Sequence, residues 1–249
     1  MHTVIGIDAA TQARNVGLAL GRWESGALAI EEALTPSSNE HAIDVVAEWC
    51  VGPTLVAVDA PLGWPMAMGR SLATHRAGDV IEAPAHDVFR RLTDDRVHEI
   101  FNKRPLDVGS NLIARTAHSA LALLAGVRER TGASIPLAWK PRERARVRTI
   151  EVYPAATLRA RGLSDSGYKG KGPAEQKNRA ALLDALSEEI GPGPPLREAA
   201  SGSDHVLDAI LCVLAGADFL AGEGIPPEKA DRERVEHEGW IWVRAPEDG

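Results

Sequence analysis

Five acidic residues stand out in the sequence because each lies in or at the end of an apolar element. They are Asp8, Asp59, Glu151, Asp204 and Asp208. Ionised carboxylates are rarely buried unless they are paired or bind a cation, and several brought together repel one another. A hard divalent cation is the usual compensation, and Mg²⁺ or Mn²⁺ on carboxylate oxygens suits phosphoryl chemistry. The residue types therefore predict a metal site that acts on a phosphate ester.

Two of these carboxylates are expected at neighbouring positions. Asp8 ends the apolar run 3–8, and Asp59 ends the apolar run 55–59. Each run is typical of a buried strand, and a helix is expected between them, so the pair forms a parallel crossover. The carboxyl ends of the two strands should then meet at one edge of the sheet. Taken singly, each Asp could also do no more than end a strand and cap the next turn.

The other three acids are placed by periodicity. Glu151 alternates with Ile150 and Val152 in a short strand, so its side chain points to the opposite face from theirs. Asp204 and Asp208 are four residues apart on an apolar helix, so they share one face of it. Glu151 could instead be an exposed edge residue, and Asp204 a helix cap. The sequence leaves open which helix Asp faces the metal.

The surrounding pattern predicts an α/β protein with a mixed sheet. Strands at about 15–20 and 27–33 follow the first run closely and form an antiparallel meander with it. A largely helical insertion at about 62–147 separates the fourth strand from the fifth. A long buried helix is expected over about 203–221. We therefore interpret residues 1–249 as one domain.

The charge distribution is uneven. The formal net charge is −7, yet residues 61–148 carry 15 basic and 9 acidic residues. The densest part contains Arg142, Arg144 and Arg146, which favours a surface that attracts a polyanion such as nucleic acid. The alternative is a solvated loop or strand edge with no partner.

Several motifs occur in a defined order along the chain. They are Gly6-Ile7-Asp8, Ala57-Val58-Asp59-Ala60-Pro61-Leu62-Gly63, Arg91-Leu92-Thr93-Asp94, Glu151-Val152-Tyr153-Pro154-Ala155-Ala156, Asp204-His205-Val206-Leu207-Asp208-Ala209-Ile210 and Glu238-Gly239-Trp240-Ile241-Trp242-Val243. This series resembles the domain-of-unknown-function family 429, whose members are grouped as predicted nucleases with an RNase H-like fold. The resemblance covers nearly the whole chain.

The resemblance implies an RNase H-like sheet of five strands, three antiparallel and then two parallel, with helices on both faces. It also implies a metal-dependent nuclease in which Asp8 bridges two metals and Asp59 and Asp208 complete the cluster. Glu151 would be a further catalytic acid, although it fits that pattern less easily, and Asp204 is the alternative helix ligand. Arg91 and Asp94 either clamp a substrate phosphate or pair with each other.

Two other functions remain open on the sequence. The first turn, Gly6 to Thr11, faintly resembles the phosphate motif of actin-like and sugar-kinase ATPases, and a non-catalytic RNase H-like scaffold is also possible. The histidines lack metal-ligand spacing, and His205 should point to a different side of its helix from Asp204. The segment Lys169–Gly172 either wraps a phosphate backbone or is a flexible exposed loop, and we favour the loop. A mean hydropathy of −0.16 and the lack of a long apolar run argue against a membrane span. We expect a cytoplasmic protein.

Overall fold

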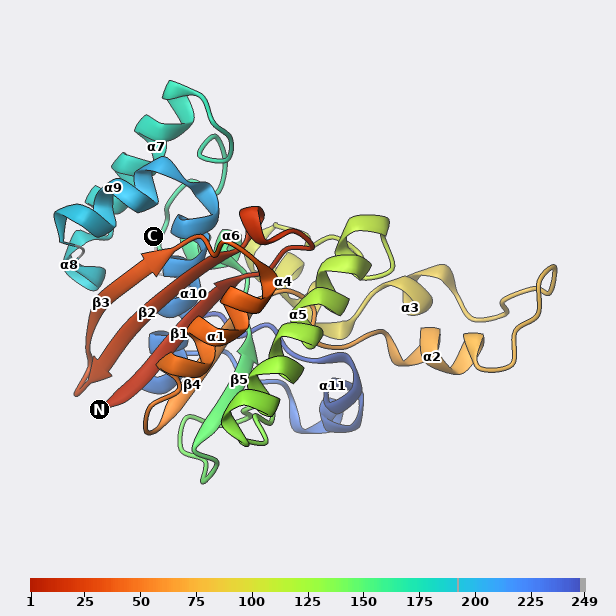
Figure 1. Cartoon of the computed structure of the whole chain (residues 1–249). Helices are drawn as coiled ribbons and strands as arrows, with labels where there is room; N and C mark the ends of the chain where they lie inside the picture. The colour runs from red at the N-terminus through yellow and green to blue at the C-terminus, as the bar shows by residue number, and fades with distance from the viewer. Residues whose placement is uncertain (192, 247–249) are drawn as a thin grey trace.

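A five-stranded sheet organises the chain in the computed structural model, which describes residues 1–191 and 193–246. The strands are β1 (His2–Asp8), β2 (Gly17–Glu24), β3 (Ala27–Leu34), β4 (Thr54–Asp59) and β5 (Val147–Glu151). Their order across the sheet is β3-β2-β1-β4-β5 (Figure 1). β1, β2 and β3 are antiparallel neighbours, whereas β4 runs parallel to β1 and β5 parallel to β4. The mixed sheet expected from the sequence is confirmed.

Helices cover both faces of this sheet. Val4 and Ala57 pack in a core with α10 (Asp204–Ala221) on one face, while Ile5 and Val58 pack on the other. The second face is covered by α1 (Asn39–Trp49) and α5 (Asn111–Thr131), as Figure 1 shows. The strict alternation along β1 and β4 produces this division, because successive strand residues point to opposite faces.

The remaining helices follow the order of the chain. Those before β5 are α2 (Met66–Leu72), α3 (Ala85–Phe89) and α4 (Leu92–Phe101), and α2 and α3 project from the body in Figure 1. Those after it are α6 (Pro154–Arg159), α7 (Pro173–Ala185), α8 (Ser187–Ile190), α9 (Pro194–Gly202) and α11 (Arg232–Glu238). The segment between β4 and β5 is thus helical. In the described part of the chain, no helix combines the length and the apolar character needed to cross a membrane.

The start of α10 lies unusually close to the sheet. Ser203 caps it, with its hydroxyl accepting a hydrogen bond from the N–H of Val206. A Cβ at Gly6 would lie 2.0 Å from the carbonyl oxygen of Ala209, and one at Gly17 would lie 1.9 Å from that of His205. Only glycine permits this approach, since any side chain would push the helix away. These two glycines bring the first turns of α10 to the carboxyl end of β1.

Candidate metal centre at the carboxyl edge of the sheet

Asp8 and Asp59 lie side by side at the carboxyl ends of β1 and β4. They are direct partners in the parallel register. Asp8 follows Val4 and Gly6 at intervals of two, and Asp59 follows Ala57, so both side chains point to the face that α10 covers. The placement predicted for this pair is therefore confirmed by the strand register.

α10 supplies the third carboxylate. Asp208 lies in its second turn and is 1% exposed. Asp8, Asp59 and Asp208 each present one carboxylate oxygen, and these oxygens all lie within 4.8 Å of one another. We call these three residues the acidic cluster. Their separation is short enough for a single cation to contact all three, and oxygen-only ligands suit a hard divalent ion.

Burial and mutual repulsion raise the pKa values of all three carboxyl groups. Burial raises the pKa of Asp8 to about 6, with a further contribution from Asp208 and an opposing one from the hydrogen bond to His205. Burial, then the charges of Asp8 and Asp208, raise the pKa of Asp59 well above its ordinary value. Burial also raises the pKa of Asp208. The protein thus holds together negative charges that disfavour one another, a pattern concentrated at functional sites.

The neighbouring side chains neutralise this charge only in part. Nδ1 of His205 lies 2.7 Å from Oδ2 of Asp8. Tyr168 donates its hydroxyl to Oδ1 of Asp208 at 2.8 Å, and Nζ of Lys169 lies 2.8 Å from Oδ2. Within residues 1–191 and 193–246, no hydrogen bond or ion pair reaches the carboxylate of Asp59. Asp59 is the carboxylate that most needs an external cation.

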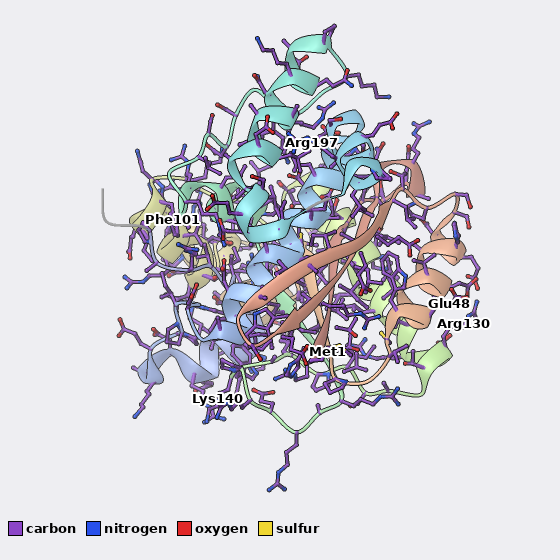
Figure 2. All side chains as sticks on the ribbon, turned by 90° about the vertical axis from the view of Figure 1, so that its left-hand side faces the viewer. Met1, Glu48, Phe101, Arg130, Lys140 and Arg197 are labelled. Atoms are coloured by element: carbon purple, nitrogen blue, oxygen red, sulfur yellow. The ribbon has the colours of Figure 1, made fainter. Side chains whose placement is uncertain are left out.

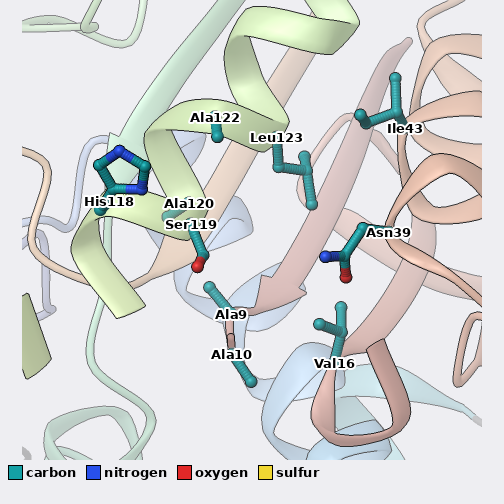
Figure 3. Close-up of a pocket in the computed structure, with 10 residues that line it drawn as sticks. All are labelled: Ala9, Ala10, Val16, Asn39, Ile43, His118, Ser119, Ala120, Ala122 and Leu123. Carbon is teal, nitrogen blue, oxygen red and sulfur yellow. The ribbon is translucent and has the colours of Figure 1, made fainter. Parts of the chain in front are cut away.

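A cavity of about 280 Å³ lies on the face of the sheet that α1 and α5 cover, opposite the face that carries the acidic cluster. Its walls come from the segment that follows Asp8, from the start of α1 and from α5. Figure 3 shows Asn39 and Leu123 pointing toward one another across it, with Ala9 and Ala10 nearby. The wall is mostly apolar with a few polar groups, so it offers a concave surface on that face of the sheet.

A comparison with models of protein families places the chain in a family. The model of a family described as "Protein of unknown function (DUF429)" matches residues 6–232 of the chain. The chain belongs to DUF429. A comparison with curated proteins finds no match.

Four buried residues form a separate group, which we call the arginine network: Arg91, Asp94, Glu151 and Glu238. Both terminal nitrogens of Arg91 donate to Glu151, at 2.8 and 2.9 Å. Arg91 also binds both oxygens of Asp94, at 2.8 and 3.1 Å. Of the two roles considered for Arg91 and Asp94, the structure thus shows the mutual pair, and their burial leaves no free guanidinium to clamp a phosphate.

Glu151 is therefore separated from the acidic cluster. In the register of β4 and β5, Ile150 is the partner of Ala57 and Glu151 is the partner of Val58. Glu151 consequently points to the opposite face of the sheet from Asp59. Both of its oxygens are bound by Arg91, so the structure does not bring Glu151 together with the three clustered carboxylates.

The helix acid left open by the sequence is decided by geometry. Asp208 joins the acidic cluster, whereas Asp204 lies outside it. Oδ2 of Asp204 accepts the N–H of Gly170 at 2.9 Å, and Oδ1 lies 4.0 Å from Nε2 of His205. Asp204 thus positions the loop that carries Lys169, and the structure does not bring it together with Asp8, Asp59 and Asp208.

The three arginines expected to guide a polyanion lie far from the cluster. Arg142, Arg144 and Arg146 are exposed in the loop that precedes β5. The carbonyl of Arg146 accepts the N–H of Thr54, the first residue of β4, so this loop borders the amino ends of the parallel strands. Figure 2 shows the adjacent Lys140 toward the same end of the molecule as Met1. They do not share a face with the cluster, which the guiding role requires.

Sequence reasoning missed three residues of the site. The sequence places His205 on a different side of its helix from Asp204 and favours an exposed loop over a phosphate-binding one for Lys169. It predicts no role for Tyr168. Their contacts with Asp8 and Asp208 bridge 197 and about 40 positions in the chain. Two features of the sequence could have pointed to these residues. One is the lysine- and glycine-rich composition of 169–172, and the other is the position of His205 beside Asp204.

Proposed function

We propose that this DUF429 protein is a divalent-metal-dependent nuclease that hydrolyses phosphodiester bonds of nucleic acid. The observation that carries the proposal is the convergence of Asp8, Asp59 and Asp208, in which no described residue donates a hydrogen bond or ion pair to the Asp59 carboxylate. The proposal includes an RNase H-like fold, which the strand order and directions support. It includes a cytoplasmic location, which agrees with Cys50 and Cys212 being free thiols.

The residues present suit Mg²⁺ or Mn²⁺. The cluster offers only carboxylate oxygens, which hard cations prefer, and its charge exceeds what Lys169 and His205 neutralise. A bound divalent ion would supply an activated water and neutralise charge on the scissile phosphate. Asp8, Asp59 and Asp208 would hold it. His205 orients the Asp8 carboxylate through its 2.7 Å contact, and the hydrogen bond from Tyr168 fixes that of Asp208.

The chain's own surfaces would contribute to binding of the substrate. The acidic cluster lies at the carboxyl edge of the sheet, and a cavity lined in part by Ala9 lies on the opposite face. Its apolar walls, with the amide of Asn39 and the hydroxyl of Ser119, suit part of a nucleotide. These features favour a nucleic acid over a free phosphate ester.

Calorimetric titration with Mg²⁺ and with Mn²⁺, combined with hydrolysis assays on single- and double-stranded DNA and RNA, tests the proposal. We expect Asp59→Asn to weaken metal binding by at least about 100-fold and to abolish hydrolysis. The metal-free variant should melt no lower than the wild type, because one of three mutually repelling charges is gone. Glu48→Gln, an exposed change on α1, is the matched control and should behave as the wild type.

Several outcomes would contradict the proposal. One is a wild-type protein that binds neither metal, which would favour a non-catalytic scaffold. Another is binding of ATP without hydrolysis of any nucleic acid, which would favour a phosphotransferase. A third is strong destabilisation of metal-free Asp59→Asn, which would show that Asp59 is a structural residue.

A further inference from the structure

A lysine side chain already brings a positive charge to the acidic cluster. Nζ of Lys169 lies 2.8 Å from Oδ2 of Asp208. The Lys169 side chain is 59% exposed, whereas that of Asp208 is 2% exposed. Lys169 is the one Lys or Arg in an ion pair with the cluster in the part of the chain that the structure describes. Its ammonium group therefore reaches inward from the solvent to the carboxylates.

The loop that carries Lys169 is built to hold it there. The buried Arg179 donates to the carbonyl oxygens of Tyr168 and Gly170, at 2.6 and 2.8 Å. Asp204 accepts the N–H of Gly170 from the other side. The backbone on both sides of Lys169 is thus fixed by hydrogen bonds. Such a framework shows that the contact with Asp208 is a built feature of the site and not a chance surface pair.

The two partners of Asp208 differ in how readily their side chains can move away from it. Tyr168 is fully buried, so its hydroxyl cannot leave without disturbing the core. Lys169 ends a flexible four-carbon side chain that is 59% exposed. A divalent ion on Asp208 would ligate at about 2.1 Å, which would leave it only a few ångströms from the ammonium group. Two cations at that distance repel each other, and Lys169 is the one that can move.

We propose that Lys169 is a displaceable internal cation. It neutralises Asp208 in the metal-free protein, leaves when a divalent ion binds, and then binds a phosphate group of the nucleic acid. This inference rests on the proposed function and extends it. It predicts that one residue weakens binding of the metal and strengthens binding of the nucleic acid. Lysine suits both tasks, since it is a compact positive charge that pairs with carboxylate and phosphate alike.

The charge of Lys169 persists in this position. Burial lowers the pKa of its ammonium group, but the contact with Asp208 and the nearby Asp59 and Asp8 raise it further, so that the net shift is upward. The ammonium group therefore stays protonated across the physiological range. The exchange is one of cations, and no proton has to be gained or lost.

The test compares Lys169→Met with the wild type and with Lys171→Met, a matched change of an exposed lysine on the same loop. Calorimetry with Mn²⁺ should show about three- to tenfold tighter binding for Lys169→Met, since no charge-assisted hydrogen bond has to be broken. Affinity for a single-stranded oligonucleotide, measured with Mn²⁺ saturating, should fall. Its log–log salt slope should decrease in magnitude by about 0.7, the value for one lost phosphate contact.

Thermal melts separate this role from a purely structural one. In EDTA, Lys169→Met should melt below the wild type, because Asp208 has lost its cation. With saturating Mn²⁺ the two should melt together, and Lys169→Arg should restore oligonucleotide binding at least in part. Lys171→Met should match the wild type throughout.

Failure of this inference differs from failure of the proposed function. Absence of Mn²⁺ binding by the wild type would overturn both. Wild-type binding of Mn²⁺ with equal or weaker binding by Lys169→Met would overturn the internal cation alone. Unchanged oligonucleotide affinity and salt slope would also overturn it, because the released lysine would then have no phosphate partner.

Discussion

The acidic cluster and the arginine network each bring three carboxylates together near the carboxyl edge of the sheet, but they compensate the charge differently. In the network, Arg91 binds two of the carboxylates through four hydrogen bonds. The third, Glu238, accepts the N–H groups of Met66 and Leu92 and contacts Arg234 at 2.9 Å. In the acidic cluster, Asp59 has no such partner among the described residues.

Under the proposed function, this difference separates a structural group from a functional one. A fully paired buried network has no capacity for a ligand, and removal of one member leaves an uncompensated charge. A cluster of carboxylates with too few cations gains from any cation that arrives, although it costs stability while it is empty. Both groups contain motifs of the same family, so the motif alone does not tell one role from the other.

The largest effect is expected from breaking the network. Arg91→Met should lower the free energy of unfolding by about 3–5 kcal/mol, because Asp94 and Glu151 would be left buried without their cation. Urea unfolding of the metal-free protein measures the loss. Arg232→Met, which removes an exposed ion pair to Glu236 on α11, is the control and should cost about 1 kcal/mol or less. A loss for Arg91→Met no larger than the control's would remove the distinction between the two groups.

A smaller effect is expected from titrating the cluster. A raised pKa means that folded Asp8 binds its proton more tightly than unfolded Asp8 does, so its contribution is complete below pH about 4. That contribution is lost as the pH rises through about 6. Across this window the metal-free protein should lose roughly 1–3 kcal/mol of stability through Asp8.

The measurement is urea unfolding in EDTA at pH values from 4.5 to 7.5. The raised pKa of His205, caused first by its hydrogen bond to Asp8, gives a loss of the same sign as the pH rises through it. Asp8→Asn should remove most of the dependence in this window. If the stability of Asp8→Asn falls with pH as steeply as that of the wild type, Asp8 does not titrate in this pH range.

No effect is expected from the arginines at the far end of the strands. On the sequence alone, replacing Arg142, Arg144 and Arg146 together by Ala should flatten the salt slope of nucleic-acid binding by up to about 3. Their position at the amino ends of β4 and β5 now predicts an unchanged slope and unchanged affinity. Binding to an oligonucleotide at several salt concentrations, next to Lys169→Met, decides between the two. A flattened slope would restore the guiding role.

The sequence by itself determined the elements and which of their residues share a face. Alternation in the runs that end at Asp8 and Asp59 was sufficient to predict two strands, their parallel crossover and the meeting of their carboxylates. Four-residue spacing was sufficient to place Asp204 and Asp208 on one face of a buried helix. These inferences succeed because hydrophobic periodicity is a local property of the chain.

Only the tertiary structure decided which carboxylates are paired. Alternation showed that Glu151 faces away from Ile150, but not that Arg91, 60 positions earlier, would lie on that face. The closeness of His205 to Asp8 depends on Gly6 and Gly17, which let α10 approach the sheet. Long charged side chains reach partners that are distant in the sequence, and the local hydrophobic periodicity does not predict such contacts. The role of each carboxylate is therefore a property of the packed molecule.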